Sequence, residues 1–515
     1  MLTGDILRLS ADRHPDRTAL ICGDDRISYG GLSAAANQFG NALLGNGVSK
    51  GGTWAIMSRN LPEYVMAHFG SAQTGAMVVN LLPAYASDEL VAILKKTSAS
   101  LIVVEEIFQQ KIVDILDQVP ALQSVIVIGQ PLKDSWVSFE QFISGQPATA
   151  CRTDISDDDP FAMTFTGGTT GLPKGCLVSH RARFVSCYTT AIEHGVSESD
   201  TVATVTPFYH AMGSLVWLPT AIFAGATLVI VTGWDPDDFV ELTARHKITC
   251  TFMVPIQLRQ ILSDEHFDRD KLKSLTKVSC GGAITPADLV HEIKAKMPDT
   301  QFTNHYGQSE TGPICFYHPT HPRNKANTVG HPALGVELKI VDTEGNEVGP
   351  GDTGEIIAHG PFLMSGYYNN KEETEAYFKN NDDWGWTGDL AKKDADGFIS
   401  LVGRSKDMIV SGGVNIYPRE VEIVLENHED IIDCAVFGIP DDQWGEALVA
   451  FVAAKKPSLL DETKIIDHCT EHLARFKRPK HIRIVKSIPK TPSGKVQKPV
   501  LRQEFLERQN AAGSA

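Results

Sequence analysis

Short apolar runs alternate with helix-length segments from about residue 18 to residue 400. The runs at 54–57, 101–104 and 124–128 are too short for buried helices, and the last two are rich in β-branched side chains, so each predicts a strand. Strands that alternate with helices are typical of wound α/β layers built on parallel sheets. We therefore predict an α/β fold with a large N-terminal region of wound α/β subdomains.

The pattern changes after Gly330. Shorter strands such as 337–341 and turns such as 344–346 predict a β-rich subdomain that completes the large region. Beyond Lys406 a new alternation begins, with helices at 419–427 and 462–473 and strands at 434–438 and 447–453. We therefore divide the chain into an N-terminal domain, 1–404, and a small C-terminal α+β domain, 405–515.

Two uncharged stretches, 64–87 and 211–234, are long enough to cross a bilayer as helices. In each of them a glycine, Gly75 or Gly225, separates a helical part from a β-branched run such as 226–231. Continuous apolar runs of this kind are also typical of parallel sheets that are covered on both faces. We therefore expect buried helix and strand pairs and no membrane span.

Length and charge narrow the function classes. A chain of 515 residues is too long for one compact core, so at least two domains are expected. Its 42% apolar and 21% charged residues are ordinary for a globular protein. The formal net charge of −16 repels polyanions, which argues against a nucleic-acid partner.

The cysteines and the N-terminus bear on the cellular compartment. The nine cysteines are scattered and form no C-x-x-C pair, which indicates reduced thiols. Asp5 and Arg8 interrupt the apolar residues at the N-terminus, so it lacks the hydrophobic core of a secretion signal. We expect a cytoplasmic protein.

The strongest local signal is the stretch TFTGGTTGLPKG at 164–175, which follows an apolar strand. Its glycines let backbone N–H groups approach anionic oxygens, its threonines add donors, and Lys174 adds a positive charge, so it predicts a phosphate-binding loop. A flexible surface loop is the alternative. The spacing G-x-x-x-x-G-K-[ST] of a P-loop NTPase is absent here, and so is the G-x-G-x-x-G of a dinucleotide-binding fold.

This loop resembles the [ST]-S-G-[ST]-T-G-x-P-K-G motif of the adenylate-forming superfamily, which includes acyl-CoA synthetases, adenylation domains of peptide synthetases and beetle luciferases. The resemblance extends over nearly the whole chain, with Gly167 where the family usually has serine. It implies that ATP is bound by Thr166, Gly167, Gly168, Thr169, Thr170, Gly171 and Lys174. Thr166 and Lys174 are also expected to act in catalysis.

A second block, TNHYGQSET at 303–311, resembles the family's Y-G-x-T-E motif, with serine in place of threonine. The resemblance implies that Tyr306 stacks on adenine, Asn304 contacts its amino group, Ser309 bonds the α-phosphate and Glu310 holds Mg²⁺. Gly307 is also expected to contact ATP. One carboxylate is enough for Mg²⁺, because phosphates and water take its other positions. Upstream, Gly282 and Ala283 match the small residues beside adenine, although a Gly-Gly pair alone is more often only a turn.

Two further residues are implied to bind the ribose, and a third, Lys406, is implied to act as a hinge. Asp389 in WGWTGD resembles the aspartate that accepts the ribose hydroxyls, and Arg404 in GRSKD resembles the arginine that contacts the ribose. Lys406 would be the hinge about which a mobile C-terminal lid rotates between two half-reactions. A charged turn between domains without a ligand is the alternative.

Lys495 lies in the loop PKTPSGKV at 489–496, which matches the family's P-x-[TS]-x-[SN]-G-K-[VI]. An exposed lysine is ordinarily a solvated charge. A lysine delivered by a loop shaped by proline and glycine can instead stabilise the charge that builds up when a carboxylate attacks the α-phosphate. We predict that Lys495 is the main catalytic residue and contacts ATP.

The acid and the thiol each have candidate residues. His210, in PFYHAMG, resembles the histidine that lines the carboxylate site and is expected to act in catalysis, although a lone histidine is more often structural. The acid pocket is expected to be lined by His210, Met212, Trp217, Gly281 and Pro313, a mixture that favours a small or medium aliphatic acid or an aromatic acid. CoA is expected at Gly412, Gly413, Trp444, Phe476, Arg478 and Lys480. A helix C-terminus decorated with cations is the alternative for the basic residues.

The resemblance implies an ATP-dependent carboxylate–CoA ligase. A carboxylic acid and Mg-ATP would give acyl-AMP and pyrophosphate, and CoA would then give acyl-CoA and AMP. A stand-alone adenylation enzyme that loads a separate carrier protein is one alternative, and a non-catalytic nucleotide-binding relative is another. The oligomeric state is left open, a homodimer included.

Overall fold

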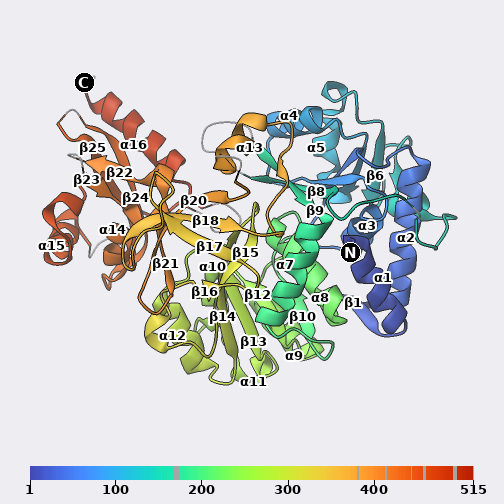
Figure 1. The fold of residues 1–515 in the computed structure, drawn as a ribbon, viewed down its shortest axis with the longest axis horizontal. Helices are drawn as coiled ribbons and strands as arrows, with labels where there is room; N and C mark the ends of the chain where they lie inside the picture. Colours follow the sequence, from blue (N-terminus) through green and yellow to red (C-terminus); the bar gives the residue numbers. More distant parts are fainter. Residues whose placement is uncertain are drawn as a thin grey trace. The chain divides into compact units, whose positions relative to one another are not determined.

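The computed structural model describes residues 1–151, 153–166, 173–379, 382–411, 414–441, 443–455, 460–490 and 496–513. The chain packs into two compact units (Figure 1). The larger unit comprises Met1–Glu337 and Ala358–Gly385, and the smaller comprises Leu338–Ile357 and Trp386–Ala515. Because the strands after Gly385 belong to the smaller unit, the predicted domain boundary at 404 lies inside that unit. A hinge between two moving domains near residue 404 stays a prediction.

One eight-stranded sheet of the larger unit is mostly parallel. Its order is β19 (Gly366–Tyr367), β9 (Lys174–Ser179), β8 (Pro160–Thr166), β4 (Met77–Asn80), β3 (Thr53–Met57), β5 (Leu101–Glu105), β6 (Ser124–Ile128) and β7 (Val137–Ser138). The strands predicted at 54–57, 101–104 and 124–128 are β3, β5 and β6, and all three are buried on both faces. β8 and β9 form an antiparallel hairpin near one edge.

A nine-stranded sheet forms the rest of the larger unit. Its order is β16 (His331–Pro332), β15 (Gly312–Tyr317), β14 (Gln301–Gln308), β13 (Lys277–Gly281), β12 (Cys250–Met253), β10 (Thr201–Thr204), β11 (Thr227–Ile230), β1 (Thr18–Cys22) and β2 (Asp25–Ser28). The strands from β14 through β1 pair in parallel, and β15 reverses direction after β14.

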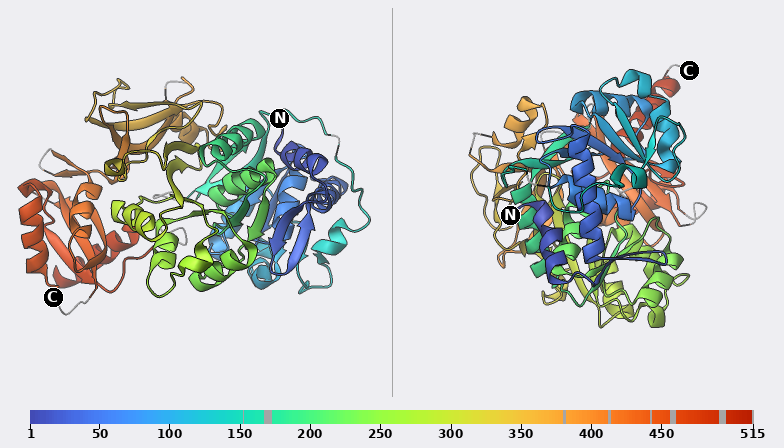
Figure 2. Two further views of the ribbon diagram at one scale, coloured as in Figure 1. Left: turned by 90° about the horizontal axis from the view of Figure 1, so that it is seen from below. Right: turned by 90° about the vertical axis from the view of Figure 1, so that its right-hand side faces the viewer.

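Helices cover these sheets. They are α1 (Thr3–Arg13), α2 (Tyr29–Gly45), α3 (Pro62–Ser71), α4 (Ser87–Thr97), α5 (Gln109–Val113), α6 (Phe139–Ile143), α7 (His180–Glu193), the π-helix η3 (Met212–Trp217), α8 (Leu218–Ala224), α9 (Pro236–His246), α10 (Pro255–Leu262), α11 (Arg269–Leu272), α12 (Ala287–Lys296) and α13 (Lys371–Tyr377). Figure 1 shows the blue helix α1 near the green helices α7 and α8, which it contacts, and α2 and α3 pack against α1; Figure 2 shows the same blue and green segments from two further sides. Apolar residues of these helices share one core with both sheets, and Trp54 in this core is fully buried. α4 and α5 cover the opposite face of the eight-stranded sheet.

The two long uncharged stretches are helix and strand pairs, as predicted. The first contains α3 and β4, and the second contains η3, α8 and β11. Gly225 ends α8 with a φ of +74°, a left-handed conformation that favours glycine. Among the residues that the structure describes, no helix is long and apolar enough to cross a membrane.

The described residues of the smaller unit form two sheets. The first is β17 (Glu337–Val341), β18 (Thr353–His359), β20 (Gly385–Lys393) and β21 (Ile399–Arg404). The second is β23 (Val414–Ile416), β22 (Ile409–Ser411), β25 (Gly445–Ala454) and β24 (Ile431–Asp441), with β26 (His481–Val485) parallel to β25. α14 (Pro418–Glu426) and α15 (Glu462–His472) cover one face of the second sheet, and α16 (Lys498–Gly513) covers the other. The predicted α/β class and the small α+β region are confirmed.

Candidate active site

The carboxyl ends of β13 and β14 carry residues predicted to lie beside adenine. The two strands are parallel neighbours with Gly281 opposite His305, so Gly282 and Ala283 follow β13 close to Tyr306 on β14. Tyr306 is buried, and Gly282 has a φ of +78°, which favours glycine. Ligands of open α/β sheets bind outside the carboxyl ends of parallel strands, so the fold places these residues at the end of the strands where a ligand is expected.

The glycines of this edge are needed for packing. A Cβ on Gly281 would lie 2.6 Å from both the ring Cδ2 and the carbonyl oxygen of His305, so the space beside Gly281 is filled by that histidine. A Cβ on Gly307 would overlap the carbonyl oxygen of Gly312 in the β14–β15 hairpin. Both positions therefore require glycine for the backbone itself, whatever else they contact.

Asn304 is buried on β14 with its side chain held at both ends. Its Oδ1 accepts a hydrogen bond from Thr285 Oγ1 at 2.9 Å, and its Nδ2 donates to the Thr328 carbonyl at 3.3 Å. A carboxamide oxygen has two lone pairs, so Oδ1 retains capacity for a second donor such as an exocyclic amino group. The geometry is compatible with the predicted contact to adenine.

The β8–β9 hairpin sets the base of the predicted phosphate loop. Thr166 and Lys174 are register partners at its loop end, where β8 finishes and β9 begins. The Lys174 ammonium pairs with the Glu373 carboxylate of α13 at 2.5 Å and lies 5.4 Å from the ring centre of Tyr367. The loop residues assigned to ATP, Gly167, Gly168, Thr169, Thr170 and Gly171, lie outside the described residues.

Ser309 and Glu310 form the turn between β14 and β15, and this turn is fastened to β9 and β19. Glu310 Oε1 accepts a hydrogen bond from the Tyr367 hydroxyl at 2.8 Å, and its backbone oxygen accepts one from Met364 N at 2.8 Å. The Ser309 carbonyl accepts a weaker bond from Cys176 Sγ at 3.5 Å. Burial, followed by the nearby Glu310 charge, raises the pKa of Tyr367, so the phenol stays protonated and donates.

The residues predicted to line the acid pocket are differently placed. His210 precedes η3, and its carbonyl accepts hydrogen bonds from Gly213 N and Ser214 N at 3.0 and 3.1 Å. Met212 is half-buried on the same π-helix. π-Helical turns occur often at functional sites, which agrees with a substrate role for this segment.

Trp217 and Pro313 are both buried. The Trp217 indole is 1% exposed and stacks on Phe252 at a centroid distance of 6.0 Å, so it belongs to the core of the larger unit. Pro313 lies on β15. A role for either side chain in recognising the acid stays a prediction.

In the smaller unit, the two predicted ribose residues lie together. Asp389 on β20 and Arg404 on β21 are cross-strand partners, and Arg404 Nε lies 2.7 Å from Asp389 Oδ1. Such an ion pair orients the carboxylate. Lys406 follows in the 3₁₀ turn η6 (Ser405–Asp407).

The residues predicted to bind CoA divide into two groups. Trp444 and Phe476 expose 47% and 48% of their surface, and Lys480 pairs with Asp441 at 2.6 Å, the same carboxylate that accepts from Trp444 N. Arg478 instead donates to the carbonyls of Leu473 and Thr470 at the end of α15, at 3.0 and 3.1 Å. It therefore has the helix-capping contacts of the alternative interpretation. Gly412, Gly413 and Lys495 lie outside the described residues.

Comparison with known protein families identifies the family to which the chain belongs. Residues 7–368 match the AMP-binding enzyme family, and residues 420–495 match the AMP-binding enzyme C-terminal domain. The chain belongs to the AMP-binding enzyme family. The predicted resemblance to adenylate-forming enzymes is confirmed.

Members of this family are similar to the chain over almost its full length. An indoleacetate–CoA ligase of Aromatoleum aromaticum is 32% identical over 499 residues, 96% of both chains. A medium/long-chain-fatty-acid–CoA ligase of Mycobacterium tuberculosis is 31% identical over 98% of this chain and 90% of its own. The crystal structure of an anthranilate CoA ligase in complex with anthranoyl-AMP has a TM-score of 0.89 at 29% identity and covers 98% of this chain and 97% of its own.

The Mg²⁺ that the family implies is compatible with Glu310. Within the part of the chain that the structure describes, no group of three or more His, Cys, Asp or Glu side chains could hold a metal ion. A lone carboxylate suits Mg²⁺ where substrate phosphates and water supply most of the ligands. The Tyr367 bond occupies one lone pair of Glu310, and a carboxylate has about four, so coordination capacity remains.

Two polar residues of this region were missed from the sequence. Tyr367 and Glu373 contact Glu310 and Lys174, but they lie outside the recognised motifs, in the stretch GYYNNKEET. A tyrosine and a glutamate in a polar segment carry no local signal of a site. The acidic first turn of α13 was the one available cue, because it favours a helix N-terminus.

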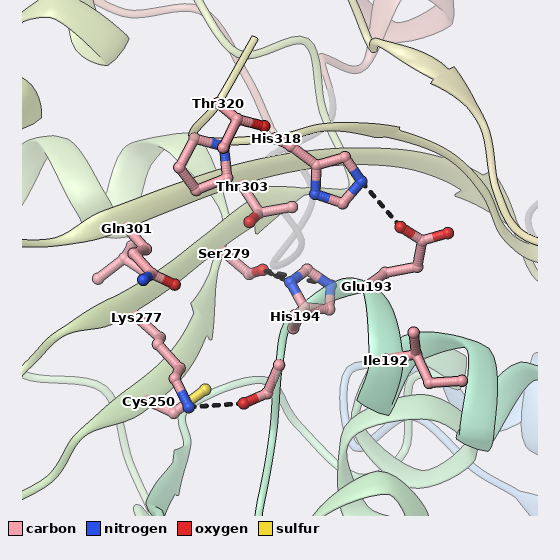
Figure 3. A pocket seen from close by; sticks show the side chains of 13 residues that line it. Ile192, Glu193, His194, Cys250, Lys277, Ser279, Gln301, Thr303, His318 and Thr320 are labelled. Carbon is pink, nitrogen blue, oxygen red and sulfur yellow. Dashed lines mark hydrogen bonds and ion pairs between the residues drawn. The ribbon is translucent and has the colours of Figure 1, made fainter.

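A cavity of about 280 Å³ lies by the amino ends of β12, β13 and β14 in the nine-stranded sheet. It is lined by Ile192, Glu193, His194, Gly195, Cys250, Lys277, Val278, Ser279, Gln301, Thr303, His318, Pro319 and Thr320 (Figure 3). Its charged groups are paired: His318 with Glu193 at 2.8 Å, and Lys277 with Asp200 at 2.8 Å. Lys277 and Gln301 begin β13 and β14, whereas Gly282 and Ala283 follow the carboxyl end of β13 and Tyr306 lies in the carboxyl-terminal half of β14. This cavity is therefore not the candidate active site.

Proposed function

We propose that this protein is an ATP-dependent carboxylate–CoA ligase of the AMP-forming class. The acid oxygen attacks the α-phosphorus of ATP and expels pyrophosphate, and the CoA thiolate then attacks the acyl carbon and expels AMP. The observation that carries this function is the full-length similarity to CoA ligases, because the matched regions include both the AMP-binding region and the C-terminal domain.

The larger unit supplies the proposed nucleotide site. Asn304 and Tyr306 bind the base, Lys174 neutralises phosphate charge, and Glu310 holds Mg²⁺, which would reduce repulsion between the two anions that must meet. The support is that Lys174 and Glu310 both contact the same tyrosine, although 136 positions separate them in the sequence (310 − 174). Fixed charges placed around the α-phosphate stabilise the transition state without reorganisation during the reaction.

The smaller unit supplies the proposed ribose and thiol contacts. Asp389 and Arg404 bind the ribose, and Lys495 stabilises the charge that develops during adenylation. Lys406 is the hinge, and Gly412, Gly413, Trp444, Phe476 and Lys480 line the path of CoA. An exposed indole and phenyl ring in one unit support a surface that binds an extended apolar ligand arm.

The acid is proposed to be an aromatic or medium aliphatic carboxylate. Relatives are named for indoleacetate, ferulate and medium-chain fatty acids. All nine cysteines are free, which supports a reducing compartment such as the cytoplasm. A homodimer stays a prediction.

The test is pyrophosphate release from ATP across a panel of aliphatic and aromatic acids, with and without CoA, followed by mass analysis. AMP and an acyl-CoA are the expected products. Acyl-AMP that persists in the presence of CoA would instead favour an enzyme that loads a carrier protein. ATP binding without turnover of any acid would favour a non-catalytic relative.

A further inference from the structure

We propose that Tyr367 is a positioning residue that holds the phosphate-binding Lys174 with its ring and the Mg²⁺-binding Glu310 with its hydroxyl. This inference rests on the proposed function, because both partners take their roles from it. It adds a residue to which neither the sequence motifs nor the comparisons assign a role. Tyr367 contacts no substrate in this proposal and acts only through its two neighbours.

The two contacts use different parts of the side chain. The hydroxyl donates to Glu310 Oε1 at 2.8 Å, and the ring centre lies 5.4 Å from Lys174 Nζ. An ammonium within about 6 Å of an aromatic ring centre is attracted to the ring's electron-rich face. A phenol that donates to a carboxylate fixes one oxygen of that carboxylate and so the direction in which the other points.

The position of Tyr367 is fixed independently of both partners. Its backbone belongs to β19, which pairs with β9 through Tyr367 opposite Cys176, and its N–H donates to Thr374 Oγ1 at 2.9 Å. The ring of Tyr377 packs edge-on against it at 6.2 Å. Since β-pairing, the helix α13 and an aromatic neighbour already hold the residue, it can order the two flexible side chains rather than follow them.

Glu373 gives the lysine a second constraint. Its carboxylate lies 2.5 Å from Lys174 Nζ, and Asn370 caps α13 by accepting from Glu373 N at 3.3 Å. The ammonium is therefore held between an aromatic face and a carboxylate. Removing only the Tyr367 hydroxyl should leave this lysine arrangement in place, which allows the two functions of the side chain to be separated.

The experiment compares Tyr367→Phe and Tyr367→Leu in the full chain by calorimetric titration of ATP over a series of Mg²⁺ concentrations, without acid. Tyr367→Phe should bind ATP within about twofold of the wild type without Mg²⁺ but need about tenfold more Mg²⁺ for full affinity, because a hydrogen bond to a charged group is lost. Tyr367→Leu should show the same Mg²⁺ defect and also bind ATP about threefold more weakly without Mg²⁺, because the ring is lost.

Tyr368→Phe is the matched control, because the neighbouring Tyr368 packs with the apolar cluster under α4 and α5. It should leave ATP affinity and the Mg²⁺ requirement unchanged. An unchanged Mg²⁺ requirement in Tyr367→Phe would overturn the inference even if Tyr367→Leu failed to fold, and so would an equal loss of affinity with and without Mg²⁺. A wild-type protein that does not bind ATP would overturn the proposed function as well, whereas wild-type binding with an unaffected Phe variant overturns only the role of Tyr367.

Discussion

Lys174 and Glu373 form an ion pair of 2.5 Å between the β8–β9 hairpin and the first turn of α13. The two side chains are 27% and 39% exposed, so the pair is open to solvent and adds little to stability, about 0.2–1 kcal/mol. Its effect on ligand binding is more direct. Because the Glu373 carboxylate is paired with the Lys174 ammonium, it competes with any ligand phosphate that would bind the same ammonium.

Glu373→Gln should therefore strengthen ATP binding. Removing the competing charge lowers the expected KM for ATP about two- to fivefold, which corresponds to the worth of an exposed ion pair. The measurement is pyrophosphate release against ATP concentration at saturating acid and Mg²⁺. Glu375→Gln is the matched control, since Glu375 lies on the same helix and pairs with Lys371 at 3.5 Å. A raised KM in Glu373→Gln alone would show that the pair positions Lys174 for ATP instead of competing with it.

Gly281→Ala should destabilise the larger unit by about 1–3 kcal/mol, because its Cβ would press against His305. Gly281→Ala combined with His305→Ala should lose less than the sum of the two single losses, since removing the ring relieves the side-chain part of the clash and leaves the contact with the carbonyl. Urea unfolding measures all three variants. Gly45→Ala in α2, where an added Cβ meets no atom within 4 Å, should not destabilise and serves as control. Additive losses in the double variant would contradict the packing role given to His305.

The same pair of residues shows what the sequence can and cannot predict. The strands and their burial followed from short β-branched runs, and the family motifs predicted Lys174 and Glu310. The packing requirement for glycine at position 281 could not be predicted, because only the pairing of β13 with β14 brings His305 beside Gly281. Tyr367 lies 57 positions from Glu310 on a two-residue strand, too short to leave any periodic pattern. Local patterns predict elements, and contacts across the fold have no local signature.

Stability should fall in mild acid because of buried histidines such as His68. Burial, and then the charges of Arg183 and His180, lower the pKa of His68 from 6.5 to about 3. Below pH 6.5 the unfolded chain therefore binds a proton that the folded chain does not, so stability is present above that pH and is lost as pH falls towards 3. Compared with pH 7.5, one such group lowers the free energy of unfolding by about 1.4 kcal/mol at pH 5.5.

His68→Leu tests this effect. Between pH 7.5 and pH 5.5 the free energy of unfolding should fall by about 1.4 kcal/mol less in the variant than in the wild type. This difference does not depend on how stable the variant is at pH 7.5. The measurement is the free energy of unfolding in urea at both pH values. His472→Leu is the control, because His472 is half exposed at the end of α15, whereas His68 is buried. Equal pH dependence in His68→Leu and wild type would mean that His68 is protonated in the folded chain.

Lys495→Ala and Lys406→Pro should separate the two half-reactions. If Lys495 stabilises the charge that develops at the α-phosphate, its loss lowers adenylation about 10²-fold or more and spares thioester formation from supplied acyl-AMP. If the backbone at Lys406 must rotate between the two steps, proline, which fixes φ near −65°, spares adenylation and abolishes thioester formation. Each step is measured by itself, adenylation as pyrophosphate release in a single turnover and thioester formation from purified acyl-AMP and CoA. Lys464→Ala, on the solvated first turn of α15, is the control for loss of a cation from the smaller unit. Equal losses in both steps for Lys495→Ala would assign that lysine to ATP or AMP binding in general, and equal losses for Lys406→Pro would place the hinge elsewhere.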